Sequence, residues 1–445
     1  MNIISGFECL RQQVEDINSL KIYGKVISIK GILIECNGIN DFVAIGSRCK
    51  IRDIQKTQEI LCEVVGFSND TVLLMSFNDT EGIGSGALVE VYRHDNVIAP
   101  DMSWLGRIVN AFGEPIDELG PLKVGGSAYQ LKAQPPASQK RGRIGAKIDL
   151  GVKVIDTFAS CCYGQRMGIF AGSGVGKSVL ISMLTKYAAT DVKVIGLVGE
   201  RSREVKEFIE EYLGADGLKQ AVIVVATGDE SALLRKRAAY TTMAIAEYFR
   251  DHGKEVLCII DSITRFAMAQ REIGLAIGEP PTTKGYTPSV FSELPKLLER
   301  AGPGVNGVNI TGLFTVLVEG DDQNEPVSDT VRGTVDGHIV MDRSIAERGR
   351  FPAVDVLKSV SRAMPQCNSD LENRQVNFAK RMLSIYHDMA EMIRLGAYKK
   401  GADPDVDLAI NYYNKLETFL SQKPNEICAM SESYQQLGDI LSIKE

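Results

Sequence analysis

A glycine-rich turn stands at Ala171-Gly172-Ser173-Gly174-Val175-Gly176-Lys177-Ser178. It follows an apolar run, Met167 to Phe170, and precedes a segment whose apolar residues recur at helical spacing from Val179 to Leu184. A strand-to-helix turn that ends in Gly-Lys-Ser is typical of a P-loop, whose backbone N–H groups hold phosphate oxygens. Lys177 is expected to carry positive charge to the outer phosphates, and the Ser178 hydroxyl to hold Mg²⁺. The pattern predicts a site for ATP and Mg²⁺ formed by all eight residues.

One residue of this turn departs from the strict pattern, which has glycine where this chain has Ala171. The alternative is a glycine-rich turn that binds no ligand. The Gly-Lys-Ser sequence at the required spacing, between a strand and a helix, favours the P-loop.

Two acidic residues end neighbouring predicted strands, in Val198-Gly199-Glu200 and Ile259-Ile260-Asp261. Because ligands of open parallel sheets bind beyond the carboxyl ends of the strands, both carboxylates should face the phosphates. Asp261 is expected in the Mg²⁺ shell, through a water molecule. Glu200 is expected to orient and deprotonate the water that attacks the γ-phosphate. Taken alone, a polar residue at a strand end is commonplace, so these roles depend on the P-loop.

The composition is that of a globular protein. The chain has 445 residues, of which 44% are hydrophobic and 24% charged, with a net charge of −7. This charge argues against a dedicated nucleic-acid binder. The nine cysteines form no C-x-x-C pair and the four histidines no H-x-x-x-H pair, so neither a disulfide framework nor a His-based metal site is predicted. No segment reaches the ~18 apolar residues of a membrane span, and the expected location is cytoplasmic.

The N-terminal region changes character after residue 20. Residues 1–20 have helix-like spacing, whereas short β-branched runs follow, at Lys25–Lys30, Ile32–Cys36, Ile60–Phe67 and Val72–Phe77. Such runs predict a small antiparallel barrel or sandwich. The first 100 residues hold 9 Lys and Arg but 13 Asp and Glu, whereas a barrel that grips RNA should be basic.

The rest of the chain divides into three parts. Residues 120–145 are rich in Gly, Pro and basic residues and predict a linker or an extended wrap. From about 146 to 365, apolar runs alternate with helical patterns, which indicates a mainly parallel sheet covered by helices. After 369 only helical spacing remains, over about 370–396, 404–421 and 432–442. These segments predict a C-terminal helical domain.

The segment Gly199-Glu200-Arg201-Ser202-Arg203-Glu204-Val205 resembles the catalytic-glutamate segment of rotary-type ATPases, the group of the F-type and V-type ATP synthase subunits. Leu105–Asn110, Gly113–Asp117 and Gly164–Arg166 belong to the same resemblance, which extends from about 22 to 420.

Within that group the chain is most similar to the ATPases of type III protein export. The similarity rests on Ala269–Gly274, Gly278–Tyr286, Pro288–Phe291 and Leu317–Pro326. Thr311-Gly312-Leu313-Phe314 and Asp322-Gln323 resemble the flagellar export ATPase more than its injectisome relative.

The resemblance implies a homo-hexameric ring with nucleotide at each subunit interface. Ser359-Val360-Ser361-Arg362 matches the family's arginine-finger segment, so Arg362 is expected to reach the neighbouring site. The alternative for Arg362 is a solvated or ion-paired arginine after a strand. The residues expected to be catalytic are Lys177, Glu200, Arg201, Asp261 and Arg362. Among the arginines, Arg201 and Arg265 are expected to organise the carboxylates.

Three features keep alternatives open. Many relatives place an aromatic residue on the adenine about a dozen positions after the finger, but this chain has Asn373 there and no aromatic before Phe378. The acidic loop Glu319–Glu325 resembles the segment that faces a central stalk, yet it also fits an exposed turn. Residues 1–20 could dock a regulatory partner or cover the barrel.

The fold class predicted is α/β, a RecA-like P-loop ATPase core with an N-terminal small β-barrel and a C-terminal helical domain. The predicted bounds are 1–20 for the helical segment, 21–95 for the barrel, 96–365 for the nucleotide-binding domain and 366–445 for the helical domain.

The functional hypothesis is a ring ATPase that energises flagellar type III export. Its expected partners are an export regulator, a stalk-like coiled coil, chaperones with their substrates, and the membrane export gate, with no nucleic acid. It would associate peripherally with the inner-membrane export apparatus. The alternatives are an injectisome ATPase, an ATP synthase subunit and a Rho-like RNA helicase. Glu200 argues against a non-catalytic synthase subunit, Thr282 to Phe291 against a synthase β subunit, and the acidic N-terminal region against a helicase.

Overall fold

The computed structural model describes residues 21–52, 59–93, 96–137, 139–318 and 325–443. The chain divides into two compact units. The first contains the residues up to Asn96 together with Ile273–Glu279, and the second contains the remainder. The two units are described separately below. Residues 1–20 and most of the acidic loop 319–325 lie outside the described residues, so the expectations for them stay predictions.

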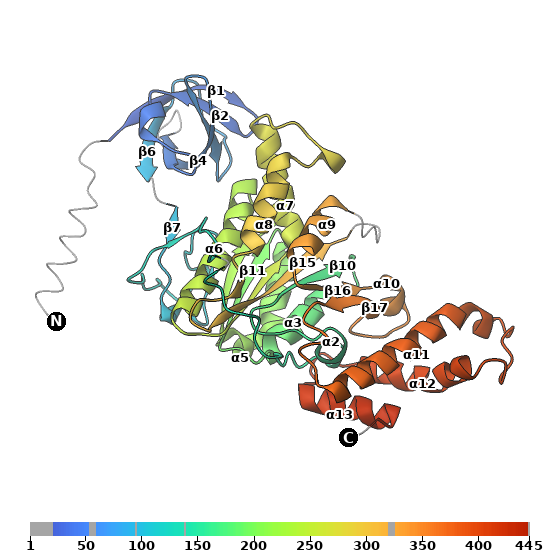
Figure 1. The fold of residues 1–445 in the computed structure, drawn as a ribbon. Helices are drawn as coiled ribbons and strands as arrows, with labels where there is room; N and C mark the ends of the chain where they lie inside the picture. The colour runs from blue at the N-terminus through green and yellow to red at the C-terminus, as the bar shows by residue number, and fades with distance from the viewer. Residues whose placement is uncertain (1–20, 53–58, 94–95, 138, 319–324, 444–445) are drawn as a thin grey trace, which may run out of the picture. The chain divides into compact units, whose positions relative to one another are not determined.

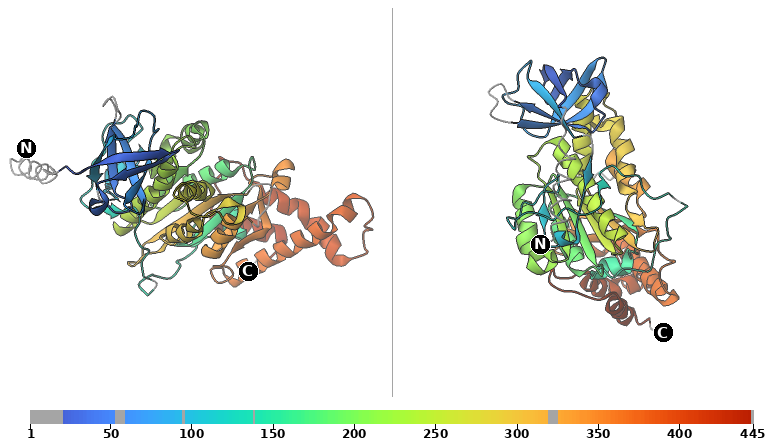
Figure 2. Two further views of the ribbon diagram at one scale, coloured as in Figure 1. Left: turned by 90° about the horizontal axis from the view of Figure 1, so that it is seen from above. Right: turned by 90° about the vertical axis from the view of Figure 1, so that its left-hand side faces the viewer.

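The first unit is a closed antiparallel barrel (blue in Figures 1 and 2). The strand order is β1-β2-β5-β4-β3-β6. Alternate residues point inward, and the interior holds Val26, Ile34, Ile51, Val64 and Leu74 among others. The elements are β1 (Tyr23–Lys30), β2 (Leu33–Asn37), the 3-10 turn η1 (Asn40–Phe42), β3 (Arg48–Arg52), β4 (Glu59–Ser68), β5 (Thr71–Ser76) and β6 (Leu88–Arg93).

The second unit is built on a mainly parallel sheet of order β17-β16-β10-β15-β13-β11-β12-β8. Only the edge pair β16–β17 and the short strand β14 against β15 run antiparallel. The strands are β8 (Ile108–Val109), β10 (Arg166–Ala171), β11 (Val192–Val198), β12 (Ala221–Ala226), β13 (Val256–Asp261), β14 (Gly302–Pro303), β15 (Asn309–Leu317), β16 (Gly337–Met341) and β17 (Val354–Ser361). The pair β7 (Val97–Ile98) and β9 (Tyr129–Gln130) forms a separate two-stranded sheet.

Helices cover both faces of this sheet (Figure 1). Because successive strand residues point to opposite faces, Ile195 and Leu197 of β11 enter one core, and Val194 and Val198 enter the other. The first core holds α2 (Lys153–Phe158), α3 (Lys177–Tyr187), α4 (Ser202–Glu207), the π-helix η3 (Phe208–Leu213) and α5 (Gly214–Leu218). The second holds α6 (Ala232–Asp251), α7 (Ile263–Ala276), α8 (Pro288–Leu298) and α9 (Pro326–Thr334). The remaining short elements are η2 (Met102–Trp104), η4 (Thr283–Gly285) and α10 (Arg343–Glu347).

The C-terminal part consists of α11 (Asp370–Arg394), α12 (Pro404–Leu420) and α13 (Met430–Leu441). The first two lie side by side as a hairpin (red in Figures 1 and 2). Each has a strong start signal, since Ser369 and Glu372 form a capping box and the Asp403 side chain caps α12. Gln422 joins these helices to α2, because its side chain accepts from the Lys153 N–H at 2.8 Å and donates to the Gly151 carbonyl at 2.8 Å.

These observations confirm the predicted fold class, an α/β core with an N-terminal barrel and a C-terminal helical domain. The domain bounds predicted from the sequence stay predictions. The eight described cysteines have free thiols; seven are buried and Cys367 is half-buried. No helix in the described part of the chain is long and apolar enough to cross a membrane.

Candidate active site

The glycine-rich turn links β10 to α3, as a P-loop does. Gly174 and Gly176 have φ of 78° and 87°, in the left-handed region, and Gly176 is the N-cap of α3. Glycine adopts this conformation without the steric cost that a side chain imposes. The turn therefore leads directly into the N-terminus of α3, where helix N–H groups and the helix dipole favour an anion.

The turn lines a cleft of about 630 Å³. All its residues from Gly172 to Ser178 except Val175 belong to the lining, whereas Ala171 and Val175 are buried. Glu200, Arg201 and Arg265 line the same cleft. Its volume lies in the range of ligand pockets for molecules the size of a nucleotide.

Lys177 is held between the two acidic residues predicted from the sequence. Its Nζ lies 2.5 Å from Asp261 Oδ1 and 3.1 Å from Glu200 Oε1. The strands explain this meeting, since β11 and β13 pair in parallel and both end at this edge of the sheet. Thr315 of β15 donates its hydroxyl hydrogen bond to Asp261 Oδ1 at 2.6 Å. The sheet edge thus gathers one ammonium and two carboxylates.

The charges in this cluster shift one another's pKa values. Burial raises the pKa of Glu200, and the negative charge of Asp261 raises it further, to about 7, although Lys177 opposes the shift. Burial lowers the pKa of Lys177, but the charges of Asp261 and Glu200 outweigh it and leave that pKa above its usual value. A carboxyl group with a pKa near neutrality can accept a proton in a reaction at neutral pH.

A tight turn after β11 places Glu200. Gly199 has a φ of 72°, and a Cβ at this position would lie 2.7 Å from Cβ of Arg265. The Gly199 N–H donates to the Ala226 carbonyl at 2.6 Å, and the Glu200 carbonyl accepts from the Gly228 N–H at 2.9 Å. The turn is therefore fixed on both sides, and only glycine fits at its first residue.

The two arginines beside the cluster are placed differently from the acids. The Arg201 side chain is 83% exposed and pairs with Glu204 at 3.4 Å rather than with either carboxylate of the cluster. The Arg265 side chain reaches the Met268 sulfur at 3.6 Å, and its buried Nε has no hydrogen-bond partner among the described residues. Neither arginine makes a hydrogen bond or ion pair to Glu200 or Asp261 within the described part of the chain.

The residues considered for the adenine lie elsewhere. The Asn373 amide donates to the Pro365 carbonyl at 3.1 Å, and Phe378 packs edge-on against Tyr412 among the C-terminal helices. Neither lines the cleft. Phe351, which the sequence did not single out, is 46% exposed, and a Cβ at Gly176 would lie 3.5 Å from its ring, although Phe351 is not among the residues that line the cleft. The sequence shows only an aromatic residue at position 351, and its closeness to the P-loop depends on the order of β10, β16 and β17.

Arg362 lies outside the cleft of its own chain. It follows β17, its side chain is exposed, and its Nη2 donates to the Arg332 carbonyl at 3.4 Å. The structure therefore brings together the P-loop, Glu200 and Asp261, and leaves Arg362 apart from them.

Family models match three successive parts of the chain. Residues 22–91 match the beta-barrel domain of the ATP synthase alpha/beta family, and residues 151–361 match its nucleotide-binding domain. Residues 369–439 match the C-terminal domain of the type III secretion ATPase EscN.

Relatives match over nearly the full length. A flagellum-specific ATP synthase of Caulobacter vibrioides is 56% identical over 96% of this chain and 98% of its own. Another, of Bacillus subtilis, is 47% identical over 97% and 98%. A type 3 secretion system ATPase of Xanthomonas euvesicatoria is 42% identical over 94% of each chain.

Among solved structures, the assembled ATPase EscN from the enteropathogenic E. coli type III secretion system has a TM-score of 0.88 at 38% identity. The match covers 94% of this chain and 100% of that one. EscN in complex with its central stalk EscO matches with a TM-score of 0.85. The chain therefore belongs to the ATP synthase alpha/beta family, in the group of the flagellum-specific ATP synthases and type III secretion ATPases.

Proposed function

We propose that this chain hydrolyses Mg-ATP as a subunit of a homo-hexameric ring and thereby energises flagellar type III protein export. The observation that carries the proposal is the Lys177–Glu200–Asp261 cluster at the P-loop cleft. It occurs in a chain that is 56% identical to a flagellum-specific ATP synthase.

The cluster fits a magnesium-bound triphosphate. Ser178 and Asp261 offer hard oxygen atoms, and no group of three or more His, Cys, Asp or Glu side chains in the described ranges converges as a metal cage. Mg²⁺ typically uses one or two protein oxygens, several waters and the substrate's phosphates. Bound there, it would neutralise charge on the phosphates. Lys177 would exchange its carboxylate partners for phosphate oxygens, and the backbone N–H groups of the turn would fix their position.

Glu200 is proposed as the base. Its raised pKa and its place on the fixed turn after β11 suit a carboxylate that takes a proton from the attacking water. Asp261, which accepts hydrogen bonds from Lys177 and Thr315, is proposed to serve the metal shell instead. Arg201 and Arg265 are proposed to organise this region only when the nucleotide draws them toward the phosphates.

Phe351 is proposed to stack on the adenine, because its ring is exposed and lies beside Gly176 of the P-loop. Loss of such a stack costs about 1–3 kcal/mol, or roughly 5- to 150-fold in affinity. Phe351→Ala should weaken ATP binding to this degree, whereas Phe351→Tyr should keep it. Tripolyphosphate, which lacks the base, should bind all three proteins alike in calorimetry. An Ala variant that loses both ligands equally would show that Phe351 acts on the P-loop and not on the base.

The assembly is part of the proposal. EscN has been solved in an assembled form and with its central stalk EscO, and this chain shares its fold over 94% of its length. A ring would bring Arg362 to a neighbour's cleft, since it is exposed and lies apart from its own. We propose a stalk-like coiled coil, an export regulator, chaperones with their substrates and the membrane export gate as partners, met in the cytoplasm at the inner-membrane export apparatus.

An injectisome role is the second candidate, because relatives from such systems are 42% and 38% identical. The 56% identity to a flagellum-specific relative favours the flagellar role. A deletion strain distinguishes these functions. It should lose filaments and keep oxidative ATP synthesis and effector secretion. Normal filaments with failed secretion would support the injectisome, and normal filaments with failed ATP synthesis would support a synthase subunit.

A further inference from the structure

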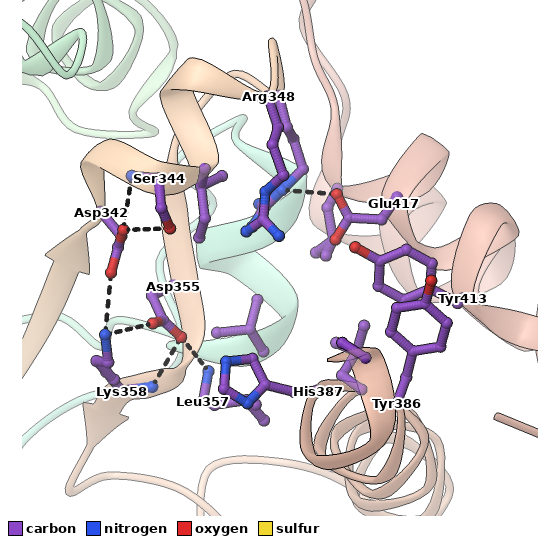
Figure 3. A pocket seen from close by; sticks show the side chains of 16 residues that line it. Asp342, Ser344, Arg348, Asp355, Leu357, Lys358, Tyr386, His387, Tyr413 and Glu417 are labelled. Atoms are coloured by element: carbon purple, nitrogen blue, oxygen red, sulfur yellow. Dashed lines mark hydrogen bonds and ion pairs between the residues drawn. The ribbon is translucent and has the colours of Figure 1, made fainter. Parts of the chain in front are cut away.

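A second pocket lies between the β17 region and the C-terminal helices (Figure 3). Its volume is about 160 Å³, and α10, the turn that follows it, β17, α11 and α12 form its walls. None of its lining residues belongs to the lining of the P-loop cleft. It is therefore a separate site of about the size of a cavity that accepts benzene.

The two carboxylates on the β17 side already receive several hydrogen bonds. Asp342 accepts from Lys358 Nζ at 2.9 Å and from the Ser344 N–H at 2.8 Å. Burial would raise the pKa of Asp342, but these hydrogen bonds outweigh it and lower the pKa to about 2. Asp355 accepts from the N–H groups of Leu357 and Lys358, and its Oδ2 lies 3.2 Å from Lys358 Nζ. Both anions are thus satisfied by the protein and offer little to a cationic ligand.

The opposite side has cationic groups in excess. The Arg350 side chain is 8% exposed, with Nε 3.1 Å from Glu417 Oε2, while its buried Nη1 has no hydrogen-bond partner among the described residues. Arg348 is exposed and makes no hydrogen bond or ion pair within the described part of the chain. Its guanidinium points into the pocket in Figure 3. Burial lowers the pKa of Arg350, and Glu417 opposes that change while Arg348 adds to it. Two guanidiniums therefore line this side of the pocket beside one carboxylate, Glu417, which pairs with Arg350.

The remaining walls are aromatic and aliphatic. Tyr386 and Tyr413 stack with ring centroids 3.5 Å apart and planes 10° from parallel. Leu383, Leu420 and Val356 complete the lining beside them. Such walls favour the burial of a flat apolar body, and a guanidinium pairs well with a planar carboxylate through two parallel hydrogen bonds.

We propose that this pocket binds a small free carboxylate with a flat apolar body, held at its charged end by Arg348 beside Arg350. The pocket is too small for a folded peptide segment. A ligand there would contact both the β17 region and the C-terminal helices. Arg350, which lines the pocket, directly precedes Phe351 in the chain.

The test uses the full chain and three probes with the same ring, namely benzoate, benzyl alcohol and benzylamine. Calorimetry at saturating ADP should show benzoate binding at least tenfold more tightly than benzyl alcohol, and no saturable binding of benzylamine. Arg348→Gln should reduce benzoate affinity to that of benzyl alcohol, since it removes the charge at an exposed position. Arg381→Gln is the matched control: Arg381 is an exposed arginine of α11 paired with Asp405, outside the pocket. It should bind benzoate as the unmutated protein does.

A crystal soaked with 4-iodobenzoate locates the probe through anomalous scattering from iodine. Iodine between the Tyr386 ring and Arg348 supports the proposal, and iodine in the P-loop cleft overturns it. The proposal is also wrong if benzoate fails to saturate, if benzylamine binds as well as benzoate, or if Arg348→Gln leaves the affinity for benzoate unchanged.

Discussion

Lys177 joins two acids that the sequence assigns to different tasks. At 2.5 Å from Asp261 and 3.1 Å from Glu200, its ammonium can neutralise one negative charge of the pair but not both. Glu200, whose pKa is raised to about 7, is the member that can take up a proton. This division gives each of the three residues a different consequence when it is replaced.

Replacement of Lys177 and Glu200 should separate binding from chemistry. Lys177→Ala should lose nucleotide binding, because the phosphates lose their cation and the two carboxylates repel them. Glu200→Gln should bind ATP and lower turnover by about 10²- to 10⁴-fold, the usual contribution of a positioned acid or base. Single-turnover hydrolysis and nucleotide affinity measure the two effects. Glu210→Gln, which changes an exposed carboxylate paired with Lys206 outside the cleft lining, is the control and should hydrolyse normally. A Glu200→Gln enzyme with near-normal turnover contradicts the assignment.

The pH dependence follows from the same pKa. A base must be deprotonated to act, so kcat/KM should be low below pH 7 and rise as pH passes through about 7, the pKa of Glu200. The profile of kcat/KM reports the free enzyme, in which Asp261 raises this pKa. Residual activity of Glu200→Gln should lack this rise. If the variant keeps the same profile, the titrating group is another residue.

Among the elements, those with strong local patterns were predictable from the sequence. The apolar runs of β10 to β13 and β15, and the long C-terminal helices, carry clear periodicity and caps. β16 was not identified, and β17 was implied only as a strand before Arg362: β17 is an edge strand with Asp355, Lys358 and exposed Val360 among its residues. The π-helix Phe208–Leu213 was also missed, because its pattern is that of an ordinary helix.

The same difference applies to the site. The P-loop, Glu200 and Asp261 could be named as candidates, and predicted to lie together, because each sits at the end of a strong strand pattern. Phe351 could not be named, because it is near the P-loop only through the strand order β17-β16-β10, which local sequence does not specify. A contact between residues of different strands can be predicted only when the strand order is known. The residue that ends a strand can be predicted from the local sequence pattern alone.

The turn after β11 can be tested with two glycines of similar backbone. Gly199→Ala places a side chain on a residue with positive φ, which strains the backbone, and adds a Cβ 2.7 Å from Arg265. Gly253→Ala causes the backbone strain alone, because its φ is 78° and nothing lies within 4 Å of its added Cβ. Both should lose about 1–2 kcal/mol of folding free energy from the backbone, and Gly199→Ala more. Only Gly199→Ala should lose turnover, by about 10²-fold, because Glu200 is displaced. Chemical denaturation and steady-state rates measure these effects, and equal rates for the two variants would show that the turn does not place Glu200.

For the whole molecule, the described chain brings the P-loop, Glu200 and Asp261 together around Lys177, but its arginine-finger candidate is elsewhere. Arg362 is exposed and bonded only weakly, at 3.4 Å, to a carbonyl of its own chain. An arginine that acts on phosphate from a neighbour must be exposed in the single subunit. The placement of Arg362 therefore leads to a prediction about assembly rather than about the isolated chain.

Arg362 is expected to act in trans and to be worth about 10³- to 10⁵-fold in turnover. Activity of the unmutated protein should then rise more steeply than linearly with its concentration, since dilution separates each P-loop from the finger of its neighbour. Arg362→Ala should fold, bind ATP and assemble, yet hydrolyse slowly at every concentration. Arg374→Ala, at a basic residue of α11 outside both pockets, is the control and should keep the concentration dependence.

The decisive measurement mixes Arg362→Ala with Lys177→Ala subunits, each nearly inactive alone. An interface between the intact P-loop of the first and the intact finger of the second should hydrolyse ATP, so mixing should restore part of the activity. If mixed rings form without recovery, the residual rate of Arg362→Ala at high dilution decides between the remaining explanations. A finger that acts within its own subunit would lower even this monomer rate, whereas a ring that needs every site in sequence would leave it equal to that of the dilute unmutated protein.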